Sequence, residues 1–285
     1  MAQHSAKQRT ARDVQQQFCV SERLPYLTIR TTRDSTQAYK AHSHAEFSVG
    51  LMLSGATQLS LPQGELLLEQ GDIILIAPQI VHACNPLADR SRSYHMLYID
   101  NAWCCDVLSA HYEYPVRQFS CNINKVAATA GSKRFNALLA AFIHQNHDAD
   151  ALAIADYLRY LLCRYCTPQT INDVANPIVH ALTQRLLQNI SSAPPLQAMA
   201  QEFKQPQATL IRTFKKHYGI TPKAFVNNQR VEQAKMLLKS GMSIVDVASE
   251  VGCADQSQLH RMFVNYTAST PRQYQQTLSI FDNKS

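Results

Sequence analysis

The sequence predicts an α+β chain of two domains: an N-terminal β-barrel that carries a helical hairpin, and a C-terminal all-α domain with two helix–turn–helix units. Three observations predict this architecture. A chain of 285 residues is long enough for about two domains. Short apolar runs separated by turn residues fill residues 26–100, and a duplicated helical segment fills most of the chain after residue 195.

The composition excludes several classes of protein. Hydrophobic residues make up 46% of the chain, which excludes wholesale disorder, and 8 glycines with 12 prolines exclude collagen-like and low-complexity chains. No apolar run approaches the roughly 18 residues that a membrane span needs, and the polar N-terminus lacks the apolar core of a secretory signal. We therefore expect no membrane partner, a cytoplasmic location and eight reduced cysteines.

The N-terminal part has the pattern of an antiparallel barrel or sandwich. We expect a loosely ordered arm over residues 1–22, followed by one domain over residues 23–166. Turn residues separate the apolar runs, and Pro62–Gly64 joins two of them closely enough for a hairpin. Six runs have the length of strands: YLTIR, FSVGLML, ATQLSL, GELLLE, IILIA and YHMLYI.

The apolar period changes to helical spacing in residues 131–166. Phe135 and Leu139, then Leu158 and Leu162, are spaced as on one face of a helix. The pattern predicts two amphipathic helices that form a hairpin. Such a hairpin can form a dimer face or pack on its own barrel, and both alternatives stay open.

The positive charge is concentrated in the C-terminal part. Pro at both ends of the polar segment 167–177 predicts a linker, and residues 178–285 form the second predicted domain. Residues 1–171 contain 15 Lys and Arg against 14 Asp and Glu, whereas residues 172–285 contain 12 against 7. The excess favours an anionic partner for the second domain, with nucleic acid the first candidate.

An internal repeat is the strongest signal in the chain. The segment that begins at Pro195 aligns with the segment that begins at Ser243, and each predicts a helix, a short turn and a second helix. Leu210 with Phe214 and Leu259 with Phe263 are i, i+4 pairs that face inward on the second helices. The stretch PKAFVNNQRVEQAKMLLKS between the units begins with Pro at a helix N-terminus, so we expect a rigid connecting helix.

The outward residues of the second helices have the chemistry of DNA recognition. A helix–turn–helix unit places its second helix in the major groove, where Arg pairs with guanine and Gln with adenine. The side chains predicted to meet base edges are Gln207, Ala208, Ile211, Arg212, Gln256, Ser257, His260 and Arg261. Those better suited to phosphates are Lys215, Lys216 and Lys223. The alternative is an ordinary solvated helix face, but the duplication and the charge balance favour double-stranded DNA as the partner.

These motifs resemble a known family. Residues 196–275 resemble the DNA-binding domain of the AraC/XylS family of bacterial transcription regulators, and the segment from FKKHYGITP to TPRQY follows that family's pattern almost throughout. The resemblance implies a regulator that associates with the nucleoid when it is bound to DNA, and that contacts RNA polymerase if it is an activator. Four positions depart from the family pattern, so we expect the second unit to contribute less to affinity; they are Cys253, Leu259, Val264 and Ala268.

A second group of residues predicts a ligand pocket in the barrel. If residues 42–48 are extended, His42, His44, Glu46 and Ser48 share one face. Three imidazoles, with His82 added, and a carboxylate can bind a divalent metal or can hydrogen-bond a polar ligand without one. Tyr94 lies on another expected strand that closes the pocket.

Residues 25–105 resemble the small-barrel cupin that serves as the effector-binding domain in the same family. In regulators of this type such residues line a metal-free pocket, and the shifted Glu46 departs from the cupin metal pattern. The resemblance implies a small polar effector such as an amino acid, a homodimer, no cofactor, no metal and no catalysis. Two alternatives stay open: a metal-dependent cupin enzyme fused to a DNA tether, and a constitutive DNA binder whose barrel only dimerises.

Overall fold

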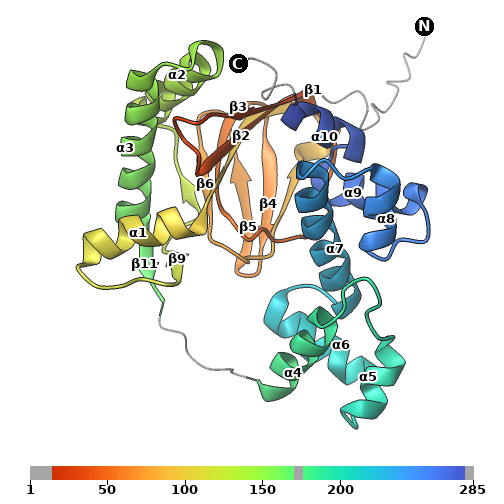
Figure 1. Ribbon diagram of the computed structural model, residues 1–285. Coiled ribbons are helices and arrows are strands. Elements are labelled where there is room, and N and C mark those ends of the chain that lie inside the picture. The colour runs from red at the N-terminus through yellow and green to blue at the C-terminus, as the bar shows by residue number, and fades with distance from the viewer. Residues whose placement is uncertain (1–14, 170–175, 280–285) are drawn as a thin grey trace, which may run out of the picture.

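The computed structural model describes residues 15–169 and 176–279, and it divides into a sheet-rich N-terminal domain and an all-α C-terminal domain (Figure 1). Every strand expected from the six apolar runs is present, so the predicted fold class is confirmed. One antiparallel sheet has the order β1 (Gln15–Val20), β2 (Leu27–Ser35), β8 (Arg92–Ile99), β3 (Phe47–Ser54), β6 (Ile73–Ile76) and β10 (Lys125–Val126). A second has the order β5 (Gly64–Leu68), β4 (Thr57–Leu61) and β7 (Ala83–Pro86).

Alternation along the strands decides which side chains face the inside of the barrel. On β3, Met52 belongs to an inner core with Tyr94 and Met96 of β8, and Leu59 and Leu68 of the smaller sheet close that core. The opposite face of the larger sheet packs against helices. A strand with both faces covered is apolar along its whole length, which is why FSVGLML contains no polar alternation.

Three helices cover the outer face of the larger sheet, opposite the C-terminal domain (Figure 1). They are α1 (Asn101–Tyr112), α2 (Ala130–Gln145) and α3 (Asp148–Tyr165). The hairpin of α2 and α3 is therefore confirmed, and Phe135, Leu139 and Leu158 pack on the sheet. Helix α1 was not predicted, although Asp100 caps it by accepting hydrogen bonds from the N–H groups of Ala102 and Trp103. None of the helices within the described ranges combines the length and apolar character of a membrane span.

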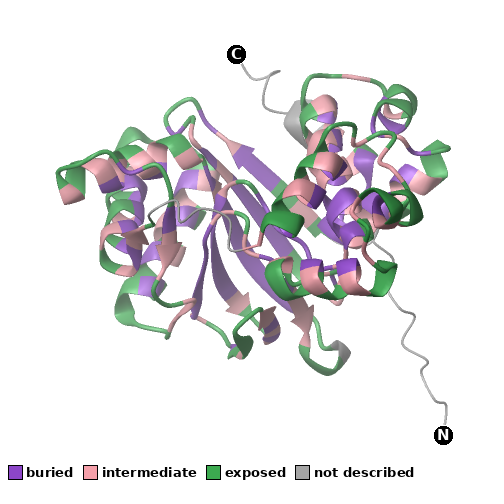
Figure 2. Ribbon diagram, turned by 90° about the horizontal axis from the view of Figure 1, so that it is seen from below, coloured by how far each residue is buried: buried purple, intermediate pink, exposed green. Residues whose placement is uncertain are grey.

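The C-terminal domain has the duplicated arrangement that the repeat predicts. Its helices are α4 (Pro177–Leu187), α5 (Leu196–Glu202), α6 (Gln207–Tyr218), α7 (Pro222–Lys239), α8 (Ile244–Glu250), α9 (Gln256–Thr267) and α10 (Pro271–Ser279). Phe214 of α6 and Phe263 of α9 are fully buried in two separate cores. Pro222 begins α7, and Thr221 caps it through the N–H of Ala224. Buried residues line the interior of both domains, and exposed ones lie on their outer helices (Figure 2).

The expected N-terminal arm is only partly supported. Residues 1–14 lie outside the described residues, but β1 pairs with β2 over its whole length. Phe18 is buried and makes an edge-to-face contact with Tyr274 of α10, 5.6 Å between ring centroids. Residues 15–20 are therefore an edge strand, because an apolar side chain in this segment has a partner in the other domain. The expected linker 167–177 likewise begins inside a short strand, β11 (Cys166–Pro168), paired with β9 (Phe119–Cys121).

Candidate functional site

The outward surfaces of α6 and α9 are accessible. Of the eight residues predicted to meet base edges, six are exposed, and Ile211 and His260 are half-buried. The lysines predicted to bind phosphates, Lys215, Lys216 and Lys223, are all exposed. Helix α7 of 18 residues separates the two units, a length of about 27 Å. This length is of the order of the roughly 34 Å between successive major grooves on one face of DNA.

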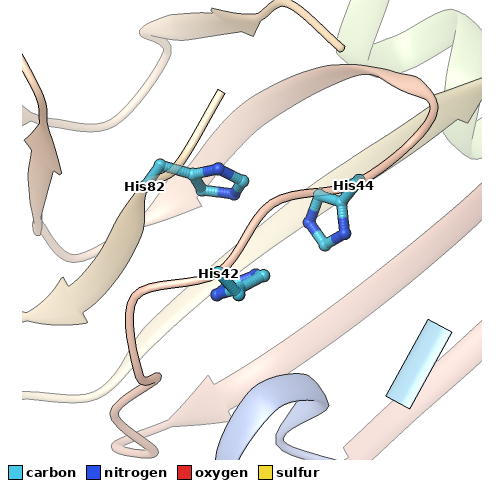
Figure 3. A group of neighbouring side chains, drawn as sticks. All are labelled: His42, His44 and His82. Carbon is cyan, nitrogen blue, oxygen red and sulfur yellow. The ribbon is translucent and has the colours of Figure 1, made fainter. Parts of the chain in front are cut away.

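Three of the residues predicted to bind an effector meet at one end of the barrel (Figure 3). His42, His44 and His82 are all buried, and each offers a ring nitrogen within 4.8 Å of the others. Backbone pairing brings them together, because the N–H of His42 donates to the carbonyl of His82 at 2.9 Å and the reverse bond measures 2.8 Å. His82 thus meets His42 through an isolated antiparallel bridge directly before β7.

The environment keeps these three rings neutral at pH 7. Burial lowers the pKa of His82 to about 4. Burial and the two neighbouring imidazoles hold the pKa of His42 well below its usual value, and burial and Lys235 do the same for His44. The Nδ1 atoms of His42 and His82 donate to the carbonyls of Lys40 and Ile80, at 2.7 and 2.9 Å. Each Nε2 is then a free acceptor.

Three neutral imidazoles have the donor chemistry of a divalent transition-metal site. Two cations stand beside them, however: Lys235 lowers the pKa of all three, and Arg30 lowers that of His44. Glu46 does not complete the set, because it lies outside the group of ligand atoms that are within 4.8 Å. Lys235 is paired with Glu232, but Arg30 forms no ion pair among the described residues, so on the side of Arg30 the charge favours an anionic or neutral ligand over a cation.

The histidines open on one side into a small cavity inside the barrel. Its empty volume is about 450 Å³, including the space at its mouth. Tyr94, Met96 and Tyr98, which alternate along β8, all line it, as predicted for Tyr94. Arg30 of β2 and Arg92 of β8 also line it, and both are buried.

On the other side His42 and His44 face a second cavity that both domains form. Its empty volume is about 1280 Å³, including its open mouth. Glu46 lines this cavity from the barrel, and Glu232 and Lys235 line it from α7. Glu232 accepts a hydrogen bond from Lys235 at 2.7 Å, and its Oε1 lies 3.8 Å from Nδ1 of His44. A ligand that contacts His44 is therefore separated by only one side chain from α7, the helix that joins the two helix–turn–helix units.

Polar contacts join the two domains, and those between Asn228 and Ser43 are buried. Asn228 of α7, 1% exposed, donates through Nδ2 to the carbonyl of Ser43 at 3.0 Å and to its hydroxyl at 3.2 Å. The N–H of Ser43 donates back to Oδ1 of Asn228 at 3.4 Å. The N–H of Lys40 donates to the carbonyl of Asn265 at 3.0 Å. Ser43 lies between His42 and His44, so the histidine cluster and α7 are held in one arrangement.

Replacing this amide tests how firmly the domains are docked. We expect Asn228→Ala to lower the free energy of unfolding by about 1–3 kcal/mol, because it leaves buried polar groups of Ser43 without partners. The matched control is Gln233→Ala, which removes a half-buried amide from the side of the same helix that faces away from Ser43. Urea unfolding of both variants measures the difference. Equal losses in the two variants would contradict this role of Asn228.

Two of the six predicted effector residues, Glu46 and Ser48, do not line the cavity inside the barrel. Residues 42–48 do not form one extended segment, as was expected, because the chain bends at Ala45 and Glu46, and β3 begins only at Phe47. Glu46 therefore faces the cavity between the domains. Ser48 is fully buried, its hydroxyl has no partner among the described residues, and it lines neither of the two cavities.

Several other residues of the site leave only a partial signal in the sequence, or none. Arg30 and Arg92 were detectable in part, because an Arg inside a strand such as LTIRTTR has to face one side of the sheet. Tyr39 lies in a segment without regular structure, so no periodicity indicates it. Asn228 and Lys235 reach the site only through docking of the domains, which leaves no local pattern.

Comparison with known proteins agrees with both halves of this arrangement. Residues 24–162 match the model of the AraC-like ligand-binding domain, and residues 199–277 match a helix-turn-helix domain model. The chain is 24% identical over 248 residues to the HTH-type transcriptional regulator YbfI of Bacillus subtilis, covering 82% of this chain and 87% of that one. It is 22% identical over 259 residues to the RCS-specific transcriptional activator RclR of Escherichia coli, with the same two coverages.

A solved structure supports the fold over nearly the whole chain. An apo crystal structure of ToxT from Vibrio cholerae, with one residue substituted, aligns with a TM-score of 0.54 at 14% identity, over 89% of this chain and 98% of that one. At this identity the likeness concerns the fold alone. The matched models and the relatives that cover both domains show that the chain belongs to the AraC family of helix-turn-helix transcriptional regulators.

Proposed function

We propose that this protein is a ligand-responsive regulator that reads double-stranded DNA with α6 and α9 and binds a small polar effector at its buried histidines. One observation carries the proposal: both second helices bury their apolar side and expose the polar side that was expected to meet DNA. Membership of the family supports transcription regulation through DNA binding. The accessible Arg212 and Arg261 can recognise bases.

The two units differ at their helix N-termini. Asp255 caps α9 by accepting a hydrogen bond from the N–H of Gln258 at 2.6 Å. Helix α6 begins after Pro206 and has no side-chain cap, so its free N–H groups and positive dipole end are available to a phosphate. A carboxylate at the corresponding place on α9 repels a phosphate. This difference supports the expectation that the first unit contributes more to affinity.

Effector binding is proposed to act through α7. A ligand that touches His44 changes the surroundings of Glu232 and Lys235 and thereby favours one arrangement of the two domains. Regulation then requires different effector affinities for the two arrangements. The active form is proposed to be a cytoplasmic homodimer that contacts RNA polymerase if it activates, and exposed Leu152 and Tyr160 on α3 offer an apolar contact surface.

The recognition surface predicts two different mutant phenotypes. Arg212→Ala and Arg261→Ala are expected to relax base preference about ten- to hundred-fold at the contacted positions, because base contacts carry the sequence information. Lys215→Ala is expected to weaken binding to all sequences similarly. It should also reduce the slope of log K against log salt concentration by about one. Selection from a random DNA library, followed by shift assays at several salt concentrations, measures both effects.

The matched control is Lys133→Ala, an exposed lysine on the N-terminal domain. It should leave both the selected motif and the salt dependence as in the wild type. If both arginine variants keep the wild-type base preference, the assignment of the recognition surface is wrong. If the wild-type protein selects no motif at moderate salt, the proposed function itself fails.

A further inference from the structure

Two arginines lie inside the barrel, a place that proteins normally reserve for apolar side chains. Arg92 is 1% exposed and Arg30 is 6% exposed, and both line the cavity inside the barrel. Both guanidinium carbons lie close to the same two rings, at 5.9 Å from the ring centre of Tyr39 and at 5.6–5.8 Å from that of Tyr94. An arginine side chain stays charged in proteins. The cavity therefore contains two positive charges.

Much of the hydrogen-bonding capacity of this pair is unused. Arg92 donates from Nη2 to the carbonyls of Cys84 and Gln37, at 2.8 and 3.2 Å, whereas its Nε and Nη1 have no partner among the described residues. Arg30 donates from Nη1 to the carbonyl of Thr267 at 3.2 Å and from Nη2 to the hydroxyl of Tyr39 at 3.4 Å. Its Nε likewise has no partner in the part of the chain that the structure describes. Three buried N–H donors thus have no hydrogen-bond partner among the described residues, although buried donors in proteins normally have one.

Among the residues that the structure describes, no counterion lies next to this positive charge. Within the described residues, no carboxylate forms an ion pair with Arg30 or Arg92, and none lines the cavity. The remaining titratable neighbours are tyrosines, Cys84 and the three neutral histidines. Removing an unpaired charge from water is costly unless a partner of opposite sign completes the site. A metal ion would add to the positive charge, so the missing partner is an anion.

The rest of the lining specifies what else the anion contains. The apolar part of the cavity wall is formed by Met52, Leu68, Ile74 and Met96. The enclosed part of the cavity is much smaller than its total empty volume and leaves room only for a small molecule, and its apolar wall favours a short hydrocarbon portion over a fully hydrated inorganic ion. Carboxylates match the donor geometry of guanidinium groups.

We propose that the effector is a small carboxylic acid with a short aliphatic part, whose carboxylate binds the free donors of Arg30 and Arg92 inside the barrel. This inference rests on the proposed function, since it names the chemical class of the effector. The aliphatic part then lies against Met52 and Met96, and the neutral histidines form another part of the cavity wall. Binding places a negative charge next to Arg30, whose Nη1 also donates a hydrogen bond to the carbonyl of Thr267 of α9. The carboxylate is thereby linked to the DNA-binding domain through one side chain.

The first experiment uses the unmodified full chain and matched pairs of probes. Calorimetry and thermal unfolding, at constant ionic strength, compare acetate, propionate, butyrate and hexanoate with the corresponding neutral amides. We expect saturable binding and stabilisation by one or more of the acids, with the paired amide at least ten-fold weaker because it lacks the charge. Equal effects of acid and amide, or no effect of any acid, would overturn the proposal. If inorganic phosphate stabilises the protein as strongly as the best acid does, the claim that the effector has an aliphatic part is wrong.

The second experiment removes one charge at a time. Arg92→Gln keeps an amide that can donate to the neighbouring carbonyls, and we expect it to weaken binding of the best acid about thirty-fold or more. Arg33→Gln, on the same strand as Arg30 but exposed, is the matched control and should bind as the wild type does. Arg30→Gln provides a second test if Arg92→Gln does not fold. Unchanged affinity in a folded Arg92→Gln or Arg30→Gln variant would contradict the site.

Selection of a DNA motif by the same preparations separates this inference from the proposed function. A protein that selects a motif but binds none of the acids is still a regulator, and only the effector class is then wrong. A protein that binds butyrate through Arg92 but selects no DNA sequence has the carboxylate site and lacks the proposed function.

Discussion

The protein is expected to lose about 3 kcal/mol of stability through His82 alone when the pH falls from 7 to 4. Burial lowers the pKa of His82 to about 4, whereas an unfolded chain has a histidine pKa near 6.5. Between these values the unfolded state takes up a proton that the folded state does not, so stability decreases as the pH falls through this window. Above the unfolded pKa the contribution is complete. One pKa unit corresponds to about 1.4 kcal/mol.

The effect is not limited to one ring. The pKa of His42 and of His44 is also lowered, and burial together with Arg33 lowers the pKa of His95 to about 4. Urea unfolding at pH 7.5, 6.0 and 5.0 measures the combined loss. Because His42 and His44 flank Ser43, which Asn228 of α7 contacts, protonation of the cluster is expected to weaken the contact between the domains before the barrel itself unfolds.

Variants assign this pH dependence to residues. His82→Gln should reduce the slope of stability against pH between 6 and 5 by about 1.4 kcal/mol per unit, because it removes one proton from the linkage. His180→Gln removes an exposed histidine on α4 and should leave the slope unchanged. An identical slope in His82→Gln and in the wild type would mean that the cluster does not resist protonation.

The second large effect is expected from one glycine in the second helix–turn–helix unit. Gly252 has a φ of 73°, and a Cβ placed on it would lie 1.9 Å from the carbonyl oxygen of Ser191. That carbonyl cannot easily move, because Arg230 of α7 donates to it at 3.1 Å and to the carbonyl of Ile190 at 2.9 Å. Gly252→Ala is therefore expected to cost about 3 kcal/mol or more, from the steric overlap and the unfavourable backbone angle together.

Gly241→Ala is the matched control for this prediction. Gly241 has a φ of 87°, but no described atom lies within 4 Å of a Cβ built there. Only the backbone strain remains, which costs about 1 kcal/mol. Urea unfolding of both variants, with circular dichroism to confirm the fold, measures the difference. If the two losses are equal, the contact between Gly252 and Ser191 is not important for stability.

The parts of the fold that repeat locally were predictable. The i, i+4 pairs Leu210–Phe214 and Leu259–Phe263 predict two amphipathic helices, and both pairs are buried as expected. The six apolar runs predict the strands for the same reason, since a side chain on a strand has to face one side of a sheet. In contrast, β1 was missed because its core residue Phe18 packs on Tyr274, which is distant in the sequence.

The site was predictable only where backbone pairing follows from adjacent strands. His42, His44 and His82 were expected to meet, and they do. Glu46 was misplaced because a bend before β3 breaks the alternation on which the argument depended. Arg30 and Arg92 were missed because nothing in a single strand shows that its polar side chain faces a closed interior rather than water.

The sequence by itself determined that this chain has a sheet-rich domain and two helix–turn–helix units, because amphipathic period and duplication are properties of neighbouring residues. Only the tertiary structure decided that the cavity inside the barrel holds two arginines without a described counterion, and that Ser43, between two of its buried histidines, is bonded to Asn228 of α7. These features depend on which faces of distant segments are enclosed together. Burial, and with it the energetic cost of a charge, exists only after the chain has folded.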